Sequence, residues 1–127
     1  MAKETQKIIL LVEDDEVLLR ALYLVFHGAN YTIATAGDGE TALRMAERIK
    51  PDIILLDLLL PKMDGFSFLK DIKANAALSS IPVIVLSNLG DDDSMAKAKN
   101  LGATDYFVKS ETDLSALHEK VGKLLKS

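Results

Sequence analysis

The sequence predicts an α/β fold in which five strand-then-helix units, (βα)5, build a doubly wound five-stranded parallel sheet with helices on both faces. Three observations predict it. Short apolar runs of strand length alternate with segments whose apolar residues recur at helical spacing. The runs are mostly apolar on both sides of the strand, as in strands that are covered on both faces. The chain of 127 residues is too short for an eight-fold barrel.

The five predicted strands are short apolar runs, several of which are rich in isoleucine and valine. They cover Ile8–Val12, Thr32–Ala36, Ile53–Leu56, Pro82–Leu86 and Tyr106–Val108. Because a helix separates each strand from the next, the strands are expected to be parallel and joined by right-handed crossovers. Their carboxyl ends then meet at one edge of the sheet, where ligands of such folds bind.

Each predicted helix has an apolar stripe at helical spacing. The stripes are Val17, Leu18, Ala21, Leu22 and Val25; Ala42, Met45, Ala46 and Ile49; Phe66, Leu69 and Ile72; Met95, Ala98 and Leu101; and Leu114, Leu117, Val121, Leu124 and Leu125. Asp15 is interpreted as the N-cap of the first helix. The run Asp91–Asp93 is interpreted as a solvated start of the fourth helix, favoured by the helix dipole, and not as a metal site.

The composition narrows the classes of function. The net charge of −4 gives no general attraction to nucleic acid or to anionic membranes. The chain has no cysteine, which excludes disulfides and thiolate metal sites and fits a reducing compartment. A polar start and the lack of a long apolar run argue against a secretory signal and a membrane span. We therefore expect a cytoplasmic protein without direct binding to nucleic acid or membrane.

Reactive side chains follow four of the five predicted strands. Glu13 and Asp14 follow the first strand, Asp57 the third, Ser87 the fourth and Lys109 the fifth. Asp57 interrupts a run of apolar residues, where an ionised carboxylate without a partner would carry a high desolvation cost. We therefore expect the third strand to leave the core at Asp57 and a positive group to lie beside that carboxylate.

These residue types suit phosphoryl transfer. The carboxylates of Glu13, Asp14 and Asp57 would repel one another in one pocket, and a hard divalent cation relieves that repulsion. Oxygen ligands favour Mg²⁺, with Mn²⁺ as a substitute. A carboxylate is a competent nucleophile toward a phosphoryl group and yields an aspartyl phosphate. Lys109 and the Ser87 hydroxyl can then bind phosphoryl oxygens, which supplies the positioning and neutralisation that the reaction needs.

Four stretches at these strand ends carry a resemblance to a known family. They are LLVEDDE (10–16), ILLDLLLPKMDG (54–65), PVIVLSN (82–88) and GATDYFVKS (102–110). The sequence resembles the receiver domain of bacterial two-component response regulators, a flavodoxin-like fold that includes the chemotaxis regulators. The resemblance covers essentially the whole chain. It implies the strand order 2-1-3-4-5, which is the known order of that family and not a deduction from this sequence.

The resemblance also implies a role for each site residue. Asp57 is similar to the phosphoacceptor of the family, and Asp14 to the acid that binds the metal directly. Glu13 would bind the metal through water, and the backbone carbonyl of Leu59 would be a further ligand. Pro61 and Gly65 resemble the turn after the third strand. Two switch residues follow from the same comparison, the hydroxyl of Ser87 and the aromatic ring of Tyr106, together with the site lysine Lys109.

The implied function is a phosphorylation-activated signalling switch. A histidine kinase or a histidine phosphotransfer protein would donate the phosphoryl group to Asp57 in a Mg²⁺-dependent reaction. The surface formed by the fourth helix, the fifth strand and the fifth helix would then change its binding of a downstream effector, a fused output domain or a second copy of the domain. The chain would catalyse only its own phosphorylation and a slow dephosphorylation. Residues 1–127 would form one receiver domain, either alone or as part of a longer regulator.

Three residues depart from the family pattern. Many members have proline after the site lysine, often with a cis bond before it, whereas Ser110 stands here. A cis bond before a residue other than proline is costly, so the geometry of this loop is left open. Leu59 and Leu89 occupy positions that influence how water reaches the phosphoryl group. Two apolar side chains there predict slow self-dephosphorylation.

Three other functions are considered. A degenerate receiver would only bind partners, although all the family's site positions are filled. A Mg²⁺-dependent phosphatase with an aspartyl nucleophile usually has a second aspartate two residues later, where this chain has Leu59. A flavin or nucleotide binder needs a loop after the first strand that cradles phosphate, and Glu13-Asp14-Asp15 would repel it.

Overall fold

A computed structural model describes residues 6–27 and 31–126. Residues 1–5 of the polar start, which argues against a secretory signal, lie outside the described residues. The strands are β1 Lys7–Val12, β2 Tyr31–Ala36, β3 Ile53–Leu56, β4 Val83–Ser87 and β5 Asp105–Val108. The helices are α1 Glu16–Phe26, α2 Gly39–Ile49, α3 Gly65–Ala74, α4 Asp92–Asn100 and α5 Leu114–Leu125, with a 3-10 turn at Lys109–Glu111.

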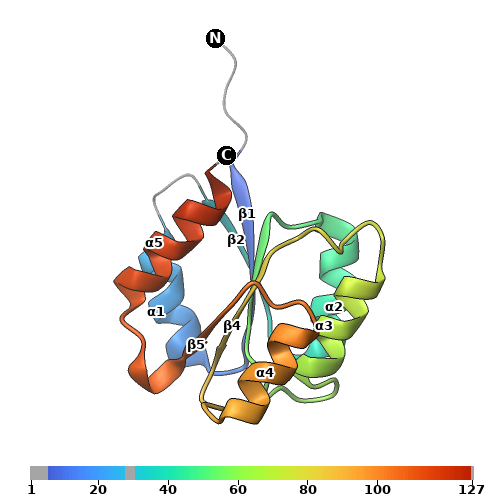
Figure 1. Cartoon of the computed structure of the whole chain (residues 1–127). Helices are drawn as coiled ribbons and strands as arrows, with labels where there is room; N and C mark the ends of the chain where they lie inside the picture. The colour runs from blue at the N-terminus through green and yellow to red at the C-terminus, as the bar shows by residue number, and fades with distance from the viewer. Residues whose placement is uncertain (1–5, 28–30, 127) are drawn as a thin grey trace.

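The strands form one parallel sheet in the order β2-β1-β3-β4-β5. Helices α1 and α5 cover one face, and α2, α3 and α4 cover the other (Figure 1). Successive residues of β1 enter different cores, because Ile9 and Leu11 face α1 and α5 while Leu10 and Val12 face α2 and α3. The predicted fold class, strand order and two-sided cover are confirmed.

The strand ends differ from the prediction by one residue in places. β3 covers the predicted range, whereas β4 begins after Pro82 and includes Ser87, and β5 begins at Asp105. Backbone pairing sets these ends, since Ser87 pairs with Val108 and Asp105 pairs with Ile84. Proline has no N–H to donate, which explains why Pro82 stays outside the ladder.

Aspartate begins each of the five α-helices within the described residues. Its side chain accepts a hydrogen bond from a backbone N–H of the first turn in every case. The capping residues are Asp15, Asp38, Asp64, Asp91 and Asp113. The interpretations of Asp15 and of the run that starts at Asp91 as helix caps are therefore confirmed.

The apolar stripe predicted for α1 is wrong at Val17. Its side chain is 80% exposed, whereas Leu22 and Phe26 are buried. Residues four apart share a helix face, so Leu18 continues the buried face and Val17 shares the outer face with Leu24, seven residues later. Leu24 is also exposed.

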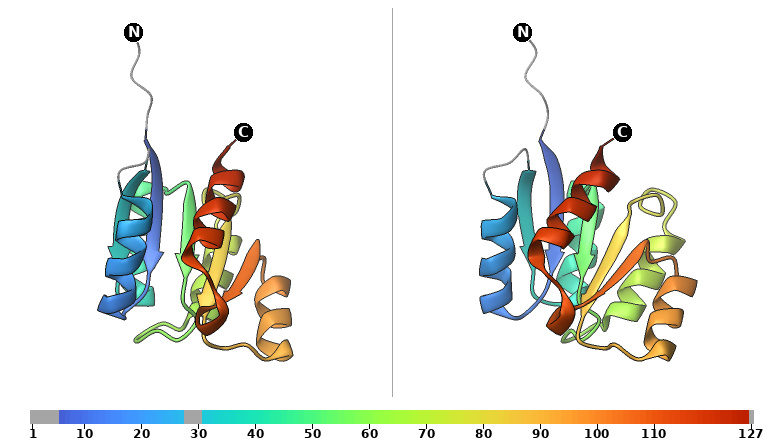
Figure 2. Two further views of the ribbon diagram at one scale, coloured as in Figure 1. Left: turned by 90° about the vertical axis from the view of Figure 1, so that its left-hand side faces the viewer. Right: turned by 60° about the vertical axis from the view of Figure 1, so that its left-hand side comes forward.

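The carboxyl ends of all five strands gather at one end of the molecule. The start of β1 and the end of α5 lie at the opposite end (Figure 2). The loops that follow β1, β3, β4 and β5 therefore meet at a single edge. No helix among residues 6–27 and 31–126 is long and apolar enough to cross a membrane.

Candidate functional site

Three carboxylates meet at the carboxyl edge of the sheet. Glu13 and Asp14 follow β1, and Asp57 follows the neighbouring strand β3, whose Leu56 pairs with Val12. The Asp57 N–H donates to the Val12 carbonyl at 3.0 Å and continues this alignment past the strand end. One carboxylate oxygen from each acid lies within 4.8 Å of the others. Strands β1 and β3 thus bring together acids that the sequence separates.

Lys109 joins this cluster from the end of the edge strand β5. Its Nζ lies 2.8 Å from Glu13 Oε1 and 2.8 Å from Asp57 Oδ2. Lys109 follows β5, so its side chain reaches past β4 to contact acids that follow β1 and β3. The positive group expected beside Asp57 is present, and the ammonium contacts two of the three carboxylates.

Burial differs among the charged groups. Glu13 is 3% exposed and Asp57 is 5% exposed, whereas Asp14 lies on the surface. Burial raises the pKa of Glu13, although hydrogen bonds from Lys109 and Asp15 oppose that shift. Burial alone would lower the pKa of Lys109, but the hydrogen bonds and charges of Asp57 and Glu13 outweigh it and raise that pKa. Lys109 is therefore held in its charged form.

The remaining oxygens of the buried acids accept backbone hydrogen bonds. The Leu59 N–H donates to Asp57 Oδ1 at 3.2 Å, and the Asp15 N–H donates to Glu13 Oε2 at 3.0 Å. Both oxygens of Glu13 thus already have protein partners, whereas Asp14 faces solvent. Both oxygens of Asp57 likewise have protein partners, Leu59 N–H and the Lys109 ammonium.

The donor set fits a hard divalent cation. All three groups are carboxylates, and together with Lys109 they leave two negative charges unbalanced. Oxygen ligands with open, solvent-facing positions suit Mg²⁺ or Mn²⁺, which keep several waters. His27 follows α1 and His118 lies in α5, where it stacks on Phe26 with ring centroids 5.3 Å apart.

Ser87 ends β4 between the strands that carry Asp57 and Lys109. It is completely buried, and its Oγ accepts a hydrogen bond from the Leu89 N–H at 3.4 Å. Leu56 of β3 pairs with Val85 of β4, and Ser87 of β4 pairs with Val108 of β5. The Ser87 hydroxyl therefore belongs to the strand between those that precede Asp57 and Lys109. The structure therefore places Ser87 at the same edge as the other site residues.

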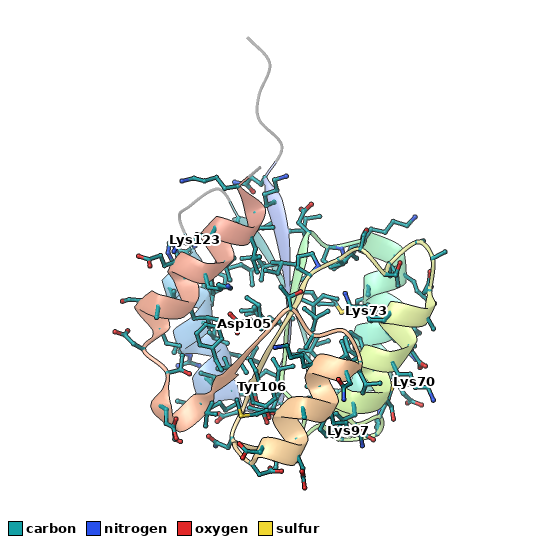
Figure 3. All side chains as sticks on the ribbon, in the orientation of Figure 1. Lys70, Lys73, Lys97, Asp105, Tyr106 and Lys123 are labelled. Carbon is teal, nitrogen blue, oxygen red and sulfur yellow. The ribbon has the colours of Figure 1, made fainter. Side chains whose placement is uncertain are left out.

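Tyr106 comes from β5 and lies beside α4 (Figure 3). Its hydroxyl donates a hydrogen bond to the carbonyl of Leu89, two residues after Ser87. Burial raises the pKa of Tyr106, and the charges of Asp91 and Asp57 add to that shift. Tyr106 also lines a surface cavity of about 340 Å³ between α4 and β5. The Tyr106 hydroxyl is thus linked to the loop that follows Ser87.

The loop after β3 packs closely against its neighbours through two glycines. A Cβ at Gly65 would lie 2.5 Å from Leu58 Cα. Gly65 was expected in the turn after the third strand, but it is the first residue of α3, because Asp64 caps the helix just before it. A Cβ at Gly39 would lie 2.2 Å from the Met63 carbonyl oxygen. The close packing at Gly39 could not be predicted, because nothing in the local sequence pattern shows which loop α2 meets.

A second contact missed from the sequence joins the loops after β4 and β5. Asn88 Oδ1 accepts a hydrogen bond from the Ser110 N–H at 3.2 Å. The described residues contain no cis peptide bond, so the bond between Lys109 and Ser110 is trans. A family pattern with proline at position 110 would have no N–H there to donate.

Comparison with protein families identifies the response regulator receiver domain, whose sequence model matches residues 9–122. Among curated relatives, the response regulator PleD of Caulobacter vibrioides is 38% identical over 84% of this chain and 23% of its own length. The alkaline phosphatase synthesis transcriptional regulatory protein PhoP of Bacillus subtilis is 36% identical over 81% of this chain and 42% of its own length. The chain thus spans less than half the length of each of these curated relatives.

Solved structures show the same likeness over nearly whole chains. The phosphorylated cyanobacterial phytochrome response regulator RcpA has a TM-score of 0.80 and 35% identity, over 94% of this chain and 91% of its own. The Mn²⁺-bound response regulator Rcp1 has a TM-score of 0.79 and 32% identity, over 93% and 91% of the two chains. The magnesium-coordinated receiver domain of PA1611 from Pseudomonas aeruginosa has a TM-score of 0.86 and 29% identity, over 96% and 99%.

Proposed function

Because this chain belongs to the receiver-domain family of two-component response regulators, a family of signalling domains, we propose that it is a switch controlled by phosphorylation of Asp57. Histidine kinases and output effectors are the partners of response regulators in general. A histidine kinase or a histidine phosphotransfer protein is the proposed donor for this chain. The proposed extent is a single receiver domain over residues 1–127, alone or within a longer regulator.

The proposed reaction is a transfer to a carboxylate oxygen. An oxygen of Asp57 attacks the phosphorus, a new O–P bond forms, and the P–N bond to the donor histidine breaks so that its electron pair returns to the imidazole. Lys109 already contacts Asp57 and Glu13 at 2.8 Å, so its ammonium is in place to bind a phosphoryl oxygen. The Ser87 hydroxyl is the proposed second donor to the phosphoryl group.

The proposed metal ligands are the Asp14 and Asp57 carboxylates, Glu13 through water, and the backbone carbonyl of Leu59. The bound ion, Mg²⁺ or Mn²⁺, would neutralise charge on the phosphoryl group during transfer. Support comes from the carboxylates within 4.8 Å of one another and from the metal-bound structures of Rcp1 and the PA1611 receiver domain. The leftover charge of the cluster matches a divalent cation.

The proposed response starts at Ser87 and reaches Tyr106. When the Ser87 hydroxyl binds the phosphoryl group, its backbone and the following Leu89 shift, and the carbonyl that accepts the Tyr106 hydrogen bond moves with them. The surface of α4, β5 and α5 then changes its population of conformations. Its proposed partner is a downstream effector, a fused output domain or a second copy of this domain.

The observation that carries the proposal is the contact of one ammonium with acids that follow two other strands. It is tested by incubating the chain with acetyl phosphate and Mg²⁺ and mapping the mass gain of one phosphoryl group. We expect the group on Asp57, none in Asp57→Asn, and a normal gain in Asp71→Asn, which changes an exposed aspartate of α3. Absence of any mass gain would favour a degenerate receiver that only binds partners, and turnover of phosphate esters would favour a phosphatase.

A further inference from the structure

We propose that Asn88 is a positioning residue for Lys109 in phosphoryl transfer and that it acts through the backbone N–H of Ser110. This proposal rests on the function proposed above and adds a residue to which no role is assigned there. Asn88 follows Ser87 at the end of β4, and Ser110 follows Lys109 after β5. The hydrogen bond of 3.2 Å from Ser110 N–H to Asn88 Oδ1 links residues 22 positions apart.

The bond gives a protein acceptor to an N–H at the solvent-exposed start of a helical turn. Lys109–Glu111 form a 3-10 turn, and the first N–H groups of any helical turn have no acceptor within it. Val108 occupies the capping position, and its apolar side chain cannot accept a hydrogen bond. Asn88 therefore acts as a cap supplied by the loop after β4, a role for which asparagine is well suited.

The other end of the turn is fixed by Thr112. Its hydroxyl donates to the Val108 carbonyl, and its N–H donates to the Lys109 carbonyl at 3.3 Å. The backbone of Lys109 is thus held between Thr112 on one side and, through Ser110, Asn88 on the other. The long lysine side chain loses conformational entropy when its ammonium is held between two carboxylates. A fixed backbone removes a second source of variation in the position of that ammonium.

A hydrogen bond ties the loop Asn88–Gly90 to β5, and Gly90 passes close to the same strand. The Tyr106 hydroxyl donates to the Leu89 carbonyl, and a Cβ at Gly90 would lie 3.4 Å from Val108 Cγ2. The loop that begins beside Ser87 therefore meets β5 at Tyr106, at Val108 and just beyond Lys109. A displacement of this loop when Ser87 engages the phosphoryl group would reach Lys109 through Asn88.

The experiment measures the initial rate of Asp57 phosphorylation by acetyl phosphate over a range of Mg²⁺ concentrations. Asn88→Ala should lower the maximal rate about fivefold, as expected for the loss of one ordinary hydrogen bond. The Mg²⁺ concentration for half-maximal rate should stay unchanged, since Asn88 is not among the proposed metal ligands. Asn88→Asp keeps an acceptor oxygen and should restore the rate. Asn100→Ala, an exposed asparagine of α4, is the matched control.

The donor side of the bond supplies the second arm. In a Ser110→Pro background the N–H is gone, so Asn88→Ala and Asn88→Asp should have equal rates. The proposal is overturned if Asn88→Ala keeps the wild-type rate, if Asn88→Asp is as slow as Asn88→Ala, or if the two differ in the proline background. ¹³C relaxation at Lys109 Cε separates this test from the proposed function. The order parameter of Lys109 Cε should fall in Asn88→Ala even if the wild-type chain takes no phosphoryl group. An unchanged order parameter would overturn the proposal.

Discussion

The Lys109 ammonium lies 2.8 Å from the Asp57 carboxylate, although the two residues are 52 positions apart in the chain. The same ammonium lies 2.8 Å from Glu13, so one cation balances two buried acids. Removing the cation and removing one acid should therefore change stability in opposite directions.

We expect Lys109→Met to destabilise the metal-free protein by about 3 kcal/mol, because it leaves two buried carboxylates without their cation. Asp57→Asn should stabilise it by about 1 kcal/mol, because it relieves repulsion among the acids while Lys109 keeps Glu13 as a partner. Urea denaturation in the presence of a chelator measures both. A change in the free energy of unfolding in the same direction for both variants would contradict this account of the cluster.

Mg²⁺ should raise the melting temperature of the wild-type chain. A ligand that binds only the folded state at a hundred times its Kd adds about 2.7 kcal/mol to the free energy of unfolding. The shift should be reduced in Asp14→Asn, which removes the exposed carboxylate of the cluster. Sodium chloride at matched ionic strength is the control, and an equal shift with that salt would argue against a specific site.

The phosphorylated chain should lose its phosphoryl group slowly. Leu59 and Leu89 offer no polar group to guide an attacking water, and Leu89 packs beside the core. Leu59→Asn should shorten the lifetime roughly tenfold, which corresponds to about 1.4 kcal/mol of barrier. Mass spectrometry after removal of the donor follows the loss, and a wild-type lifetime no longer than that of Leu59→Asn would refute the prediction.

Gly65→Ala should destabilise the fold and move Asp57. The added Cβ would lie 2.7 Å from the Asp57 carbonyl oxygen, and the atoms it meets include backbone, which yields little. We expect the free energy of unfolding to fall by roughly 1–3 kcal/mol in urea denaturation, as for other overpacked sites. Gly37→Ala is the matched control, since a Cβ there has nothing within 4 Å. A similar loss in both variants would point to a general effect of replacing glycine.

Asp38 should contribute stability that depends on pH. Hydrogen bonds from the Thr41 N–H and hydroxyl lower the pKa of Asp38 below its usual value of 3.8. Its contribution is therefore complete above pH 3.8 and is lost as the pH falls through the folded-state pKa. Asp38→Ala should lower the urea midpoint at neutral pH, and the difference from wild type should shrink as the pH falls below 3.8. A difference that grows on acidification would reverse the sign of this argument.

The sequence by itself determined the fold class and most of the site. Apolar runs such as Ile53–Leu56 identify buried strands, and aspartates such as Asp15 identify helix starts, because both depend on local periodicity and capping. The carboxyl-edge rule for parallel sheets then gathers Asp57, Ser87 and Lys109. The exposure of Val17 was missed, since a stripe of apolar residues leaves its edges undefined.

Only the tertiary structure decided which atoms meet. The hydrogen bond between Asn88 and Ser110 joins two loops, and the close approach of Gly39 to Met63 joins a helix to a loop. Neither pair has a local signal, because each residue taken alone reads as an ordinary turn or cap residue. Periodicity reports which face of an element is buried, whereas such contacts depend on loop paths and on the sub-ångström fit of neighbouring backbones.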